Sequence, residues 1–244
     1  MNVQYDAKIL VKVEETENIY TFKLEKHSDF SFSPGQYVWV SLDGYSKSPM
    51  AIASGKSDDH IMLTVRRWGE LTNALFNLSE GDLIHIDGPY GSYFPMNELK
   101  GVDNLYLVAG GTGITPVRSL LRSLSNGTHA HLFYGAQESI ELLYKKELGK
   151  SNINVKFIID KEEENWNDRI GYVTDLLQTE KFLQNSKFFI CGPPPMLKAI
   201  IEFFKTSEIN NSDVYVSIEK FDENGNVIGP VLSLTDPQVN FLKI

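Results

Sequence analysis

The sequence contains a single cysteine, Cys191, among 244 residues. One thiol excludes an intramolecular disulfide, a zinc site built from paired cysteines and a cysteine-held iron–sulfur cluster, and we expect no metal site. Basic residues are also scarce, because 23 Lys and Arg stand against 32 Asp and Glu, for a formal charge of −9. Nucleic-acid binding needs clustered Lys and Arg, so this balance argues against a nucleic-acid partner.

Long apolar runs are missing as well. No stretch reaches the roughly 18 consecutive apolar residues that a membrane-spanning helix needs. The N-terminus lacks the basic and then apolar pattern of a signal peptide. We therefore expect a cytoplasmic protein without a membrane span. A hydrophobic content of 42% over 244 residues is ordinary for one large or two modest globular domains.

The first hundred residues have the pattern of a β domain. Short β-branched or aromatic runs, separated by Gly, Pro and Asp turn residues, predict strands at 8–13, 20–24, 37–42, 50–54, 60–67 and 83–87. A helical pattern interrupts them at 72–78, with Thr72 placed as its N-cap. Six strands at this spacing predict a small antiparallel barrel.

Beyond residue 100, strands and helices alternate. Strands are predicted at 104–111, 129–136, 154–160, 187–192 and 214–221, and helices at 114–124, 138–148, 173–179 and 196–206. This alternation predicts a Rossmann-like parallel sheet with helices on both faces. With the boundary in the loop at 94–102, we expect a barrel domain at 1–98, an α/β domain at 99–221 and a C-terminal tail at 222–244.

The most specific motif is the glycine-rich turn AGGTGITP at 109–116, which follows a buried strand and opens a helix. Glycines allow close approach to a pyrophosphate, and the helix N-terminus offers free N–H groups. A tight strand-to-helix turn without a ligand is the alternative. The turn is neither the GxGxxG fingerprint nor a P-loop.

A second glycine turn, CGPPPM at 191–196, also follows a strand. Ligands of open α/β sheets bind beyond the carboxyl ends of the strands, so both turns can face one ligand. Cys191 is then either a site residue or a small buried apolar residue. In the barrel, Gly69 and Thr72 mark a second helix start suited to a phosphate, although a simple cap explains them about as well.

Together these segments resemble the ferredoxin–NADP⁺ reductase superfamily, whose members join a flavin-binding barrel to a nicotinamide-dinucleotide domain. The resemblance covers about residues 5–220. It is carried by PGQYV, SPMAIAS, VRRWGELTNALFNLSEGD, GPYGSYF, AGGTGITP, YGAQESIELLYKKEL, GYVTDLL and CGPPPM. Within the superfamily the sequence is similar to electron-transfer subunits: the gamma subunit of cytoplasmic sulfhydrogenases, the anaerobic sulfite reductase B subunit and the dihydroorotate dehydrogenase electron-transfer subunit.

The resemblance implies a role for specific residues. It places Cys191 beside the nicotinamide as the catalytic-site residue, and it implies FAD, or FMN, in the barrel. The implied cofactor-binding residues are Ser48, Pro49, Met50, Ala51, Thr64, Val65, Arg66, Gly69, Leu71 and Thr72 for the flavin, and Gly110, Gly111, Thr112, Gly113, Gly192, Pro193, Pro194 and Met196 for NAD(P).

The sequence departs from the family at two places. The flavin signature Arg-x-Tyr-Ser, or Arg-Pro-x-Ser, here reads Ser48-Pro49-Met50-Ala51. One lost charge-assisted hydrogen bond costs roughly 1.5–3 kcal/mol, which Arg66, Lys47 or backbone N–H groups of 49–53 would have to offset. The tail lacks the four cysteines that hold a [2Fe–2S] cluster in the related subunits. Phe241 in that tail either covers the flavin or only contributes to the packing of the terminal segment.

The choice of nicotinamide cofactor follows from charge. Glu138 lies in the region that meets the adenosine ribose, where a carboxylate favours a 2′-hydroxyl over a 2′-phosphate, so NAD(H) is expected over NADP(H). The predicted function is a flavin-dependent NAD(P)H oxidoreductase that exchanges electrons with a protein partner, a ferredoxin or a catalytic subunit. A non-catalytic assembly subunit with a degenerate flavin site and a flavin reductase are the alternatives.

Overall fold

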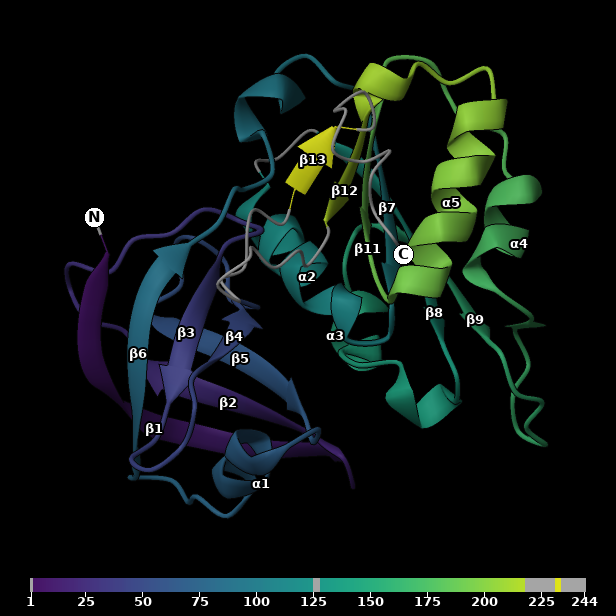
Figure 1. Ribbon diagram of the computed structural model, residues 1–244. Helices are drawn as coiled ribbons and strands as arrows, with labels where there is room; N and C mark the ends of the chain where they lie inside the picture. Colours follow the sequence, from purple (N-terminus) through teal and green to yellow (C-terminus); the bar gives the residue numbers. More distant parts are fainter. Residues whose placement is uncertain (1, 125–127, 218–230, 234–244) are drawn as a thin grey trace.

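The computed structural model describes residues 2–124, 128–217 and 231–233. Two β-sheets organise the chain, an antiparallel one from its first part and a mainly parallel one from its second part (Figure 1). None of the described helices is long and apolar enough to cross a membrane.

The first sheet is a six-stranded antiparallel barrel. Its strands are β1 (Val3–Thr16), β2 (Ile19–Glu25), β3 (Tyr37–Ser41), β4 (Ser48–Ala51), β5 (His60–Arg66) and β6 (Leu83–Tyr90). They pair in the order β4-β3-β6-β1-β2-β5, and an isolated bridge between Ile52 and Leu63 joins the two edges. Alternate residues such as Val38, Val40, Ile84 and Ile86 fill the interior. The predicted barrel is confirmed.

The second sheet combines β7 (Asn104–Gly110), β8 (His129–Ala136), β9 (Asn154–Ile159), β10 (Arg169–Ile170), β11 (Ser186–Cys191), β12 (Val214–Ser217) and β13 (Val231–Ser233). Their order is β10-β9-β8-β7-β11-β12-β13, and only β13 pairs antiparallel. Every residue of the central strand β7 is buried, as expected for a parallel strand covered on both faces. The predicted parallel sheet is confirmed.

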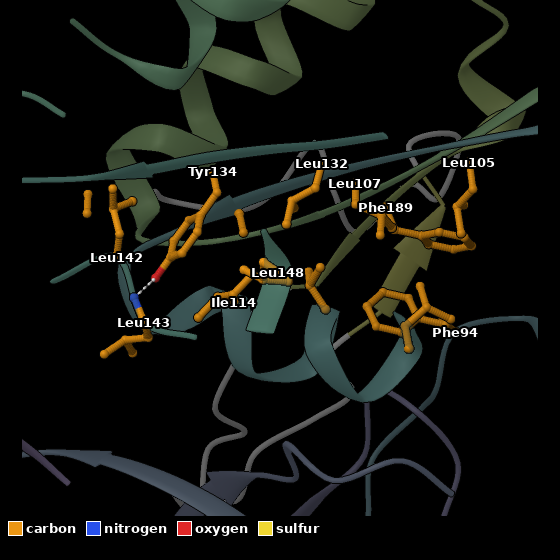
Figure 2. Close-up of a cluster of buried hydrophobic side chains, with 14 of the residues drawn as sticks. Phe94, Leu105, Leu107, Ile114, Leu132, Tyr134, Leu142, Leu143, Leu148 and Phe189 are labelled. Atoms are coloured by element: carbon orange, nitrogen blue, oxygen red, sulfur yellow. Dashed lines mark hydrogen bonds between the residues drawn. The ribbon is translucent and has the colours of Figure 1, made fainter. Parts of the chain in front are cut away.

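Helices cover both faces of this sheet. Helices α2 (Ile114–Ser123) and α3 (Lys145–Leu148) lie on the face toward the barrel, whereas α4 (Val173–Gln178) and α5 (Pro194–Thr206) lie on the far face (Figure 1). Residues of α2 and α3 share one hydrophobic cluster with β7 and β8 (Figure 2), and residues of α4 and α5 share another. The barrel has one helix, α1 (Glu70–Phe76).

The single helix predicted at 138–148 is wrong. The segment forms a 3₁₀ turn, η3 (Ser139–Glu141), and the short helix α3. Between them Leu143 N–H donates to the Tyr134 hydroxyl at 3.0 Å, and that hydroxyl lies 3.2 Å from the Glu141 carbonyl (Figure 2). A side chain from β8 therefore takes the backbone groups that a continuous helix would use. Tyr144 follows in the left-handed region with φ 57°, at a cost of about 1–2 kcal/mol.

Smaller differences occur elsewhere. Thr72 is the third residue of α1 and not its N-cap, which is Gly69. The strand predicted at 50–54 begins earlier, as β4 at Ser48, and β10 has no counterpart among the predicted strands. Of the strand expected at 214–221, Val214–Ser217 form β12, and residues 218–221 lie outside the described residues.

The connection between the two sheets is anchored by an aromatic residue. Phe94 follows β6 and is fully buried. Its ring lies 4.8 Å from that of Phe189 on β11, which in turn stacks at 5.1 Å on Tyr215 of β12. Phe94 therefore belongs to the core of the second sheet, which it shares with Leu105 and Leu107 (Figure 2).

Replacing Phe94 with Ala should lower the free energy of unfolding by about 3–5 kcal/mol, because the truncation leaves a cavity against Phe189. The neighbouring Tyr93 is 54% exposed, and Tyr93→Ala should change that free energy by less than about 0.5 kcal/mol. Denaturant titration followed by circular dichroism measures both variants. Equal losses in the two would contradict the anchoring role of Phe94.

Candidate functional site

The two glycine turns of the parallel sheet are in direct contact. They follow the neighbouring strands β7 and β11, whose carboxyl ends lie side by side. A Cβ atom added to Gly113 would lie 2.4 Å from the Cys191 carbonyl oxygen, and one added to Gly110 would lie 2.4 Å from Met196 Sδ. Gly192 is equally crowded by Met196. Glycine is therefore required at position 113, where the neighbouring atoms are backbone, whereas Gly110 and Gly192 pack against the flexible Met196 side chain. The contact unites the two motifs at one edge of the sheet.

The other side of the first turn is open. Gly111 has φ +52°, and a Cβ added to it would meet nothing within 4 Å. Thr112 and Cys191 are half-buried, whereas Pro193 and Pro194 are exposed at the start of α5. Cys191 is in no disulfide. An open glycine turn that runs into the N-terminus of α2 fits an anionic group such as a pyrophosphate.

Carboxylates gather at the ends of the adjoining strands β8 and β9. Glu138 Oε1 lies 2.6 Å from Lys161 Nζ, so a lysine partly neutralises the residue that sequence reasoning assigned to the ribose. Asp160 directly follows β9; partial burial raises the pKa of its carboxyl group, and the nearby Glu141 carboxylate raises it further. Sequence reasoning missed Asp160, although an acidic residue at the carboxyl end of a parallel strand is itself a signal.

The predicted flavin residues of β4 are divided between the two faces of the strand. Met50 is 8% exposed and belongs to the barrel core, whereas Ser48, Pro49 and Ala51 are half-buried. Lys47, which was considered as a replacement for the missing arginine, places its Nζ 4.7 Å from the centre of the Trp39 ring. Arg66 is the other cation that was expected to replace that arginine.

The predicted flavin residues of β5 contact the α/β half of the molecule. Thr64 and Val65 are buried, and the Thr64 hydroxyl is hydrogen-bonded to the Tyr144 hydroxyl. Arg66 Nη1 lies 2.8 Å from Glu141 Oε1. An incoming phosphate would have to share or displace this carboxylate.

The start of α1 is organised by Thr72. The backbone N–H groups of Trp68 and Gly69 donate to its hydroxyl at 2.8 and 2.9 Å, while Leu71 is buried. The Gly69 α-carbon faces open space. Trp68, beside Gly69, is 89% exposed. Sequence reasoning gave this residue no role, and the only feature that could have drawn attention to it is its position between Arg67 and Gly69.

The flavin-side strands lie against the helix that follows the first glycine turn. Arg118 Nη1 of α2 donates to the carbonyl of Ala53, just beyond β4, at 2.7 Å. One turn later Arg122 pairs with Asp58 at 2.8 Å. Burial by itself would raise the pKa of the Asp58 carboxyl, but hydrogen bonding to Arg122 lowers this pKa to about 2. The structure thus brings the β4–β5 region and the glycine turns to the same side of the molecule.

Comparison with known proteins agrees with this geometry. Residues 7–94 match the family of oxidoreductase FAD-binding domains, and residues 107–202 match the family of oxidoreductase NAD-binding domains. The gamma subunit of sulfhydrogenase 2 from Pyrococcus furiosus is 34% identical over 241 residues, covering 88% of this chain and 83% of that protein. The chain belongs to the ferredoxin–NADP⁺ reductase superfamily.

Other members of the superfamily are similar over most of their length. A probable dihydroorotate dehydrogenase B electron transfer subunit from Pyrococcus furiosus is 31% identical over 239 residues, covering 94% of this chain and 88% of that protein. The crystal structure of a ferredoxin NADP⁺ reductase from Neisseria gonorrhoeae superposes with a TM-score of 0.75 at 17% identity, over 86% of this chain and 96% of that one. The latter likeness establishes the shared fold.

Two expectations concern residues that the structure does not describe. Phe241 and the tail segment that lacks the cysteines of related subunits lie beyond the described residues, apart from β13. Within the described ranges, no three His, Cys, Asp or Glu side chains gather into a group that could hold a metal ion.

Replacing Gly113 with Ala tests the contact between the two turns. Its new Cβ would collide with backbone atoms of Cys191 and Gly192, so we expect a loss of about 1–3 kcal/mol in the free energy of unfolding. Thr112→Ala removes atoms from the same turn without crowding β11, and its effect should stay within about 0.5 kcal/mol. Thermal and denaturant unfolding measure both, and an unperturbed Gly113→Ala variant would refute the tight contact.

Proposed function

We propose that this chain is a flavin-dependent NAD(P)H oxidoreductase that serves as an electron-transfer subunit. The bound cofactors would supply the redox chemistry, a two-electron hydride transfer from nicotinamide to flavin followed by release of the electrons to an acceptor. The chain's own residues contribute binding, orientation and the exclusion of water. No residue has to act as a general acid or base in this scheme.

The observation that supports this function is the position of the two expected cofactor sites. The glycine turns meet at the carboxyl edge of β7 and β11, and α2, which starts at that edge, is hydrogen-bonded to Ala53 beyond β4. Two ligands bound at these places would face each other across the junction of the barrel and the sheet. Such an arrangement suits direct transfer between a nicotinamide and a flavin.

On the sheet side, the roles follow from the open glycine turn. Backbone N–H groups of the turn and of the α2 N-terminus would bind the pyrophosphate, and Cys191 would lie beside the nicotinamide. Pro193, Pro194 and Met196 would form the wall of that pocket. The residues in this group are Gly110, Gly111, Thr112, Gly113, Cys191, Gly192, Pro193, Pro194 and Met196.

On the barrel side, flavin binding would depend more on backbone hydrogen bonds than on charged side chains. Backbone groups of Ser48, Pro49, Met50 and Ala51 would meet the flavin ring edge. Thr64, Val65 and Arg66 would line the ribityl phosphate, while Gly69, Leu71 and Thr72 would hold the pyrophosphate of FAD. Because Glu141 already pairs with Arg66, the flavin phosphate would compete for that cation.

A protein partner completes the proposal. Relatives carry names such as sulfhydrogenase subunit gamma and dihydroorotate dehydrogenase B electron transfer subunit. With one cysteine in the sequence, this chain has no ligand set for an iron–sulfur cluster. Electrons would therefore pass directly between the flavin and a ferredoxin or a catalytic subunit. The cytoplasmic location stays a prediction.

A visible absorption spectrum of the purified protein tests the function. We expect flavin bands that bleach anaerobically on addition of NADH and recover when an electron acceptor is added. The missing Arg-x-Tyr-Ser signature and the Arg66–Glu141 pair favour one competing function, a flavin-free assembly subunit. A protein that stays colourless after incubation with FAD would establish that alternative, and multiple turnovers of added free FMN would establish a flavin reductase.

We further propose that the nicotinamide cofactor is NAD(H). Within the described part of the chain, the Asp160 carboxylate has no hydrogen bond or ion pair, and its pKa is raised by partial burial and then by Glu141. A 2′-phosphate at this edge would add negative charge beside Asp160 and Glu138. Lys161 pairs with Glu138 and also interacts with the carboxylates of Glu141 and Glu163. Its single charge is shared among three carboxylates, so the balance at the edge stays negative.

Asp160→Asn should lower the preference for NADH over NADPH, measured as the ratio of the two kcat/KM values, by about tenfold, because one like-charge contact is removed. Glu162→Gln, which neutralises an exposed carboxylate two residues further along the chain, is the matched control and should leave the ratio within about twofold. A wild-type protein that prefers NADPH would contradict the assignment.

A further inference from the structure

A cluster of side chains around one buried arginine joins the two halves of the molecule beside the proposed cofactor sites. This seam cluster consists of Ala53 and Thr64 from the barrel and Arg118, Tyr144 and Glu147 from the α/β half. Arg118, at its centre, is 6% exposed. Its Nη1 donates to the Ala53 carbonyl at 2.7 Å, and its Nε and Nη2 donate to Glu147 Oε2 at 3.0 and 2.8 Å.

Tyr144, the aromatic residue of the seam cluster, links Arg118 to β5. The guanidinium carbon of Arg118 lies 4.8 Å from the centre of the Tyr144 ring, and the Tyr144 hydroxyl is hydrogen-bonded to Thr64. The Thr64 hydroxyl is also hydrogen-bonded to Thr21 Oγ1 at 2.8 Å. Burial raises the pKa of Tyr144, so its hydroxyl keeps its proton and can donate at neutral pH.

Both barrel contacts of the cluster reach the strand region expected to carry the flavin. Thr64 belongs to β5, and the N–H of Ala53 donates to the Met62 carbonyl of β5 at 2.8 Å. At the other end, Arg118 lies on α2, one turn beyond the glycine turn whose Gly113 packs on Cys191. Arg118 thus connects the flavin-side strand to the nicotinamide-side turn through a short rigid path.

The backbone of Tyr144 supports a positional role. Its left-handed conformation, φ 57°, ψ 14°, is unfavourable for a side chain of this size and persists where surrounding contacts impose it. Here those contacts are the Arg118 guanidinium on the ring and Thr64 on the hydroxyl. The strained residue therefore occurs where the two halves are held together.

We propose that Arg118 is a positioning residue for hydride transfer, which fixes the separation of the nicotinamide-side turn and the flavin-side strands through Ala53 and through Tyr144 and Thr64. This inference rests on the proposed function. Transfer requires the reacting atoms to be held about 3–3.5 Å apart. Only the planar, many-donor guanidinium satisfies a carbonyl, a carboxylate and an aromatic ring at once, so lysine is not its equivalent.

Arg122 provides a matched control on the same helix. It also joins the two halves, through Asp58 at 2.8 and 2.9 Å, and it lies 3.4 Å from Glu147 within its own half. Its side chain is 38% exposed. Its barrel partner Asp58 lies further along the β4–β5 connection than Ala53, whose N–H is hydrogen-bonded to Met62 of β5. Loss of Arg122 therefore removes a cross-domain ion pair without touching Ala53 or Thr64.

The test compares Arg118→Met, Arg118→Lys and Arg122→Met in the FAD-loaded protein by rapid mixing with NADH. For Arg118→Met we expect the limiting rate of flavin reduction to fall by about 10- to 100-fold, with the apparent Kd for NADH and the FAD content changed by less than about threefold. Arg118→Lys should recover part of the rate. Arg122→Met should stay within about threefold of the wild type.

A second measurement needs no cofactor. Amide hydrogen exchange of the flavin-free protein should become faster at Ala53 and along β5 in Arg118→Met, but not in Arg122→Met. Equal rate losses in the two methionine variants, or a loss of NADH affinity equal to the loss of rate, would overturn the positioning role. If Arg118→Met does not fold, a wild-type rate in Arg118→Lys overturns it.

The two proposals fail in different ways. A wild-type protein that takes up no flavin refutes the proposed function and, with it, the positioning of a hydride transfer. The exchange measurement still decides whether Arg118 couples the barrel to α2, and unchanged exchange at Ala53 and β5 in Arg118→Met refutes that coupling by itself.

Discussion

The close approach of Gly113 to the Cys191 carbonyl is the contact on which the candidate site depends. Strands β7 and β11 are neighbours in the sheet, and their following turns can touch because Gly113 has no side chain where it meets the backbone of Cys191 and Gly192. Interiors are packed too tightly to absorb an extra methyl group without a shift of the backbone. The backbone of Cys191 is thereby held against the glycine turn.

The orientation of the barrel relative to the sheet is fixed by a different kind of contact. A guanidinium as buried as that of Arg118 must have partners, because an uncompensated charge in the interior is costly. Its partners come from the barrel and from α3 together. Relative movement of the two halves would leave this charge without its hydrogen bonds, so the seam holds one arrangement. Phe94, inserted between β11 and the barrel, adds an apolar contact to the same junction.

Strand geometry explains why the barrel tolerates an altered flavin signature. On β4 the inward residue Met50, paired with Val38 of β3, contributes to the core. Ser48 and Ala51 are only half-buried and can differ without loss of packing. The fold of the superfamily is thus retained, while Arg66, the cation proposed for a flavin phosphate, is paired with Glu141.

The sequence was sufficient to predict the features that arise from neighbours along the chain. Short β-branched or aromatic runs predicted the barrel strands, the continuous apolar run at 104–111 predicted a buried parallel strand, and the glycine turns marked the carboxyl edge. Tertiary structure alone decided which groups meet: the Tyr134 hydroxyl that breaks the helix expected at 138–148, the partners of Arg118, and the place of Asp160 at the edge. Hydrogen bonds and charges between residues far apart in sequence leave no periodic signal in it, so only the folded chain reveals them.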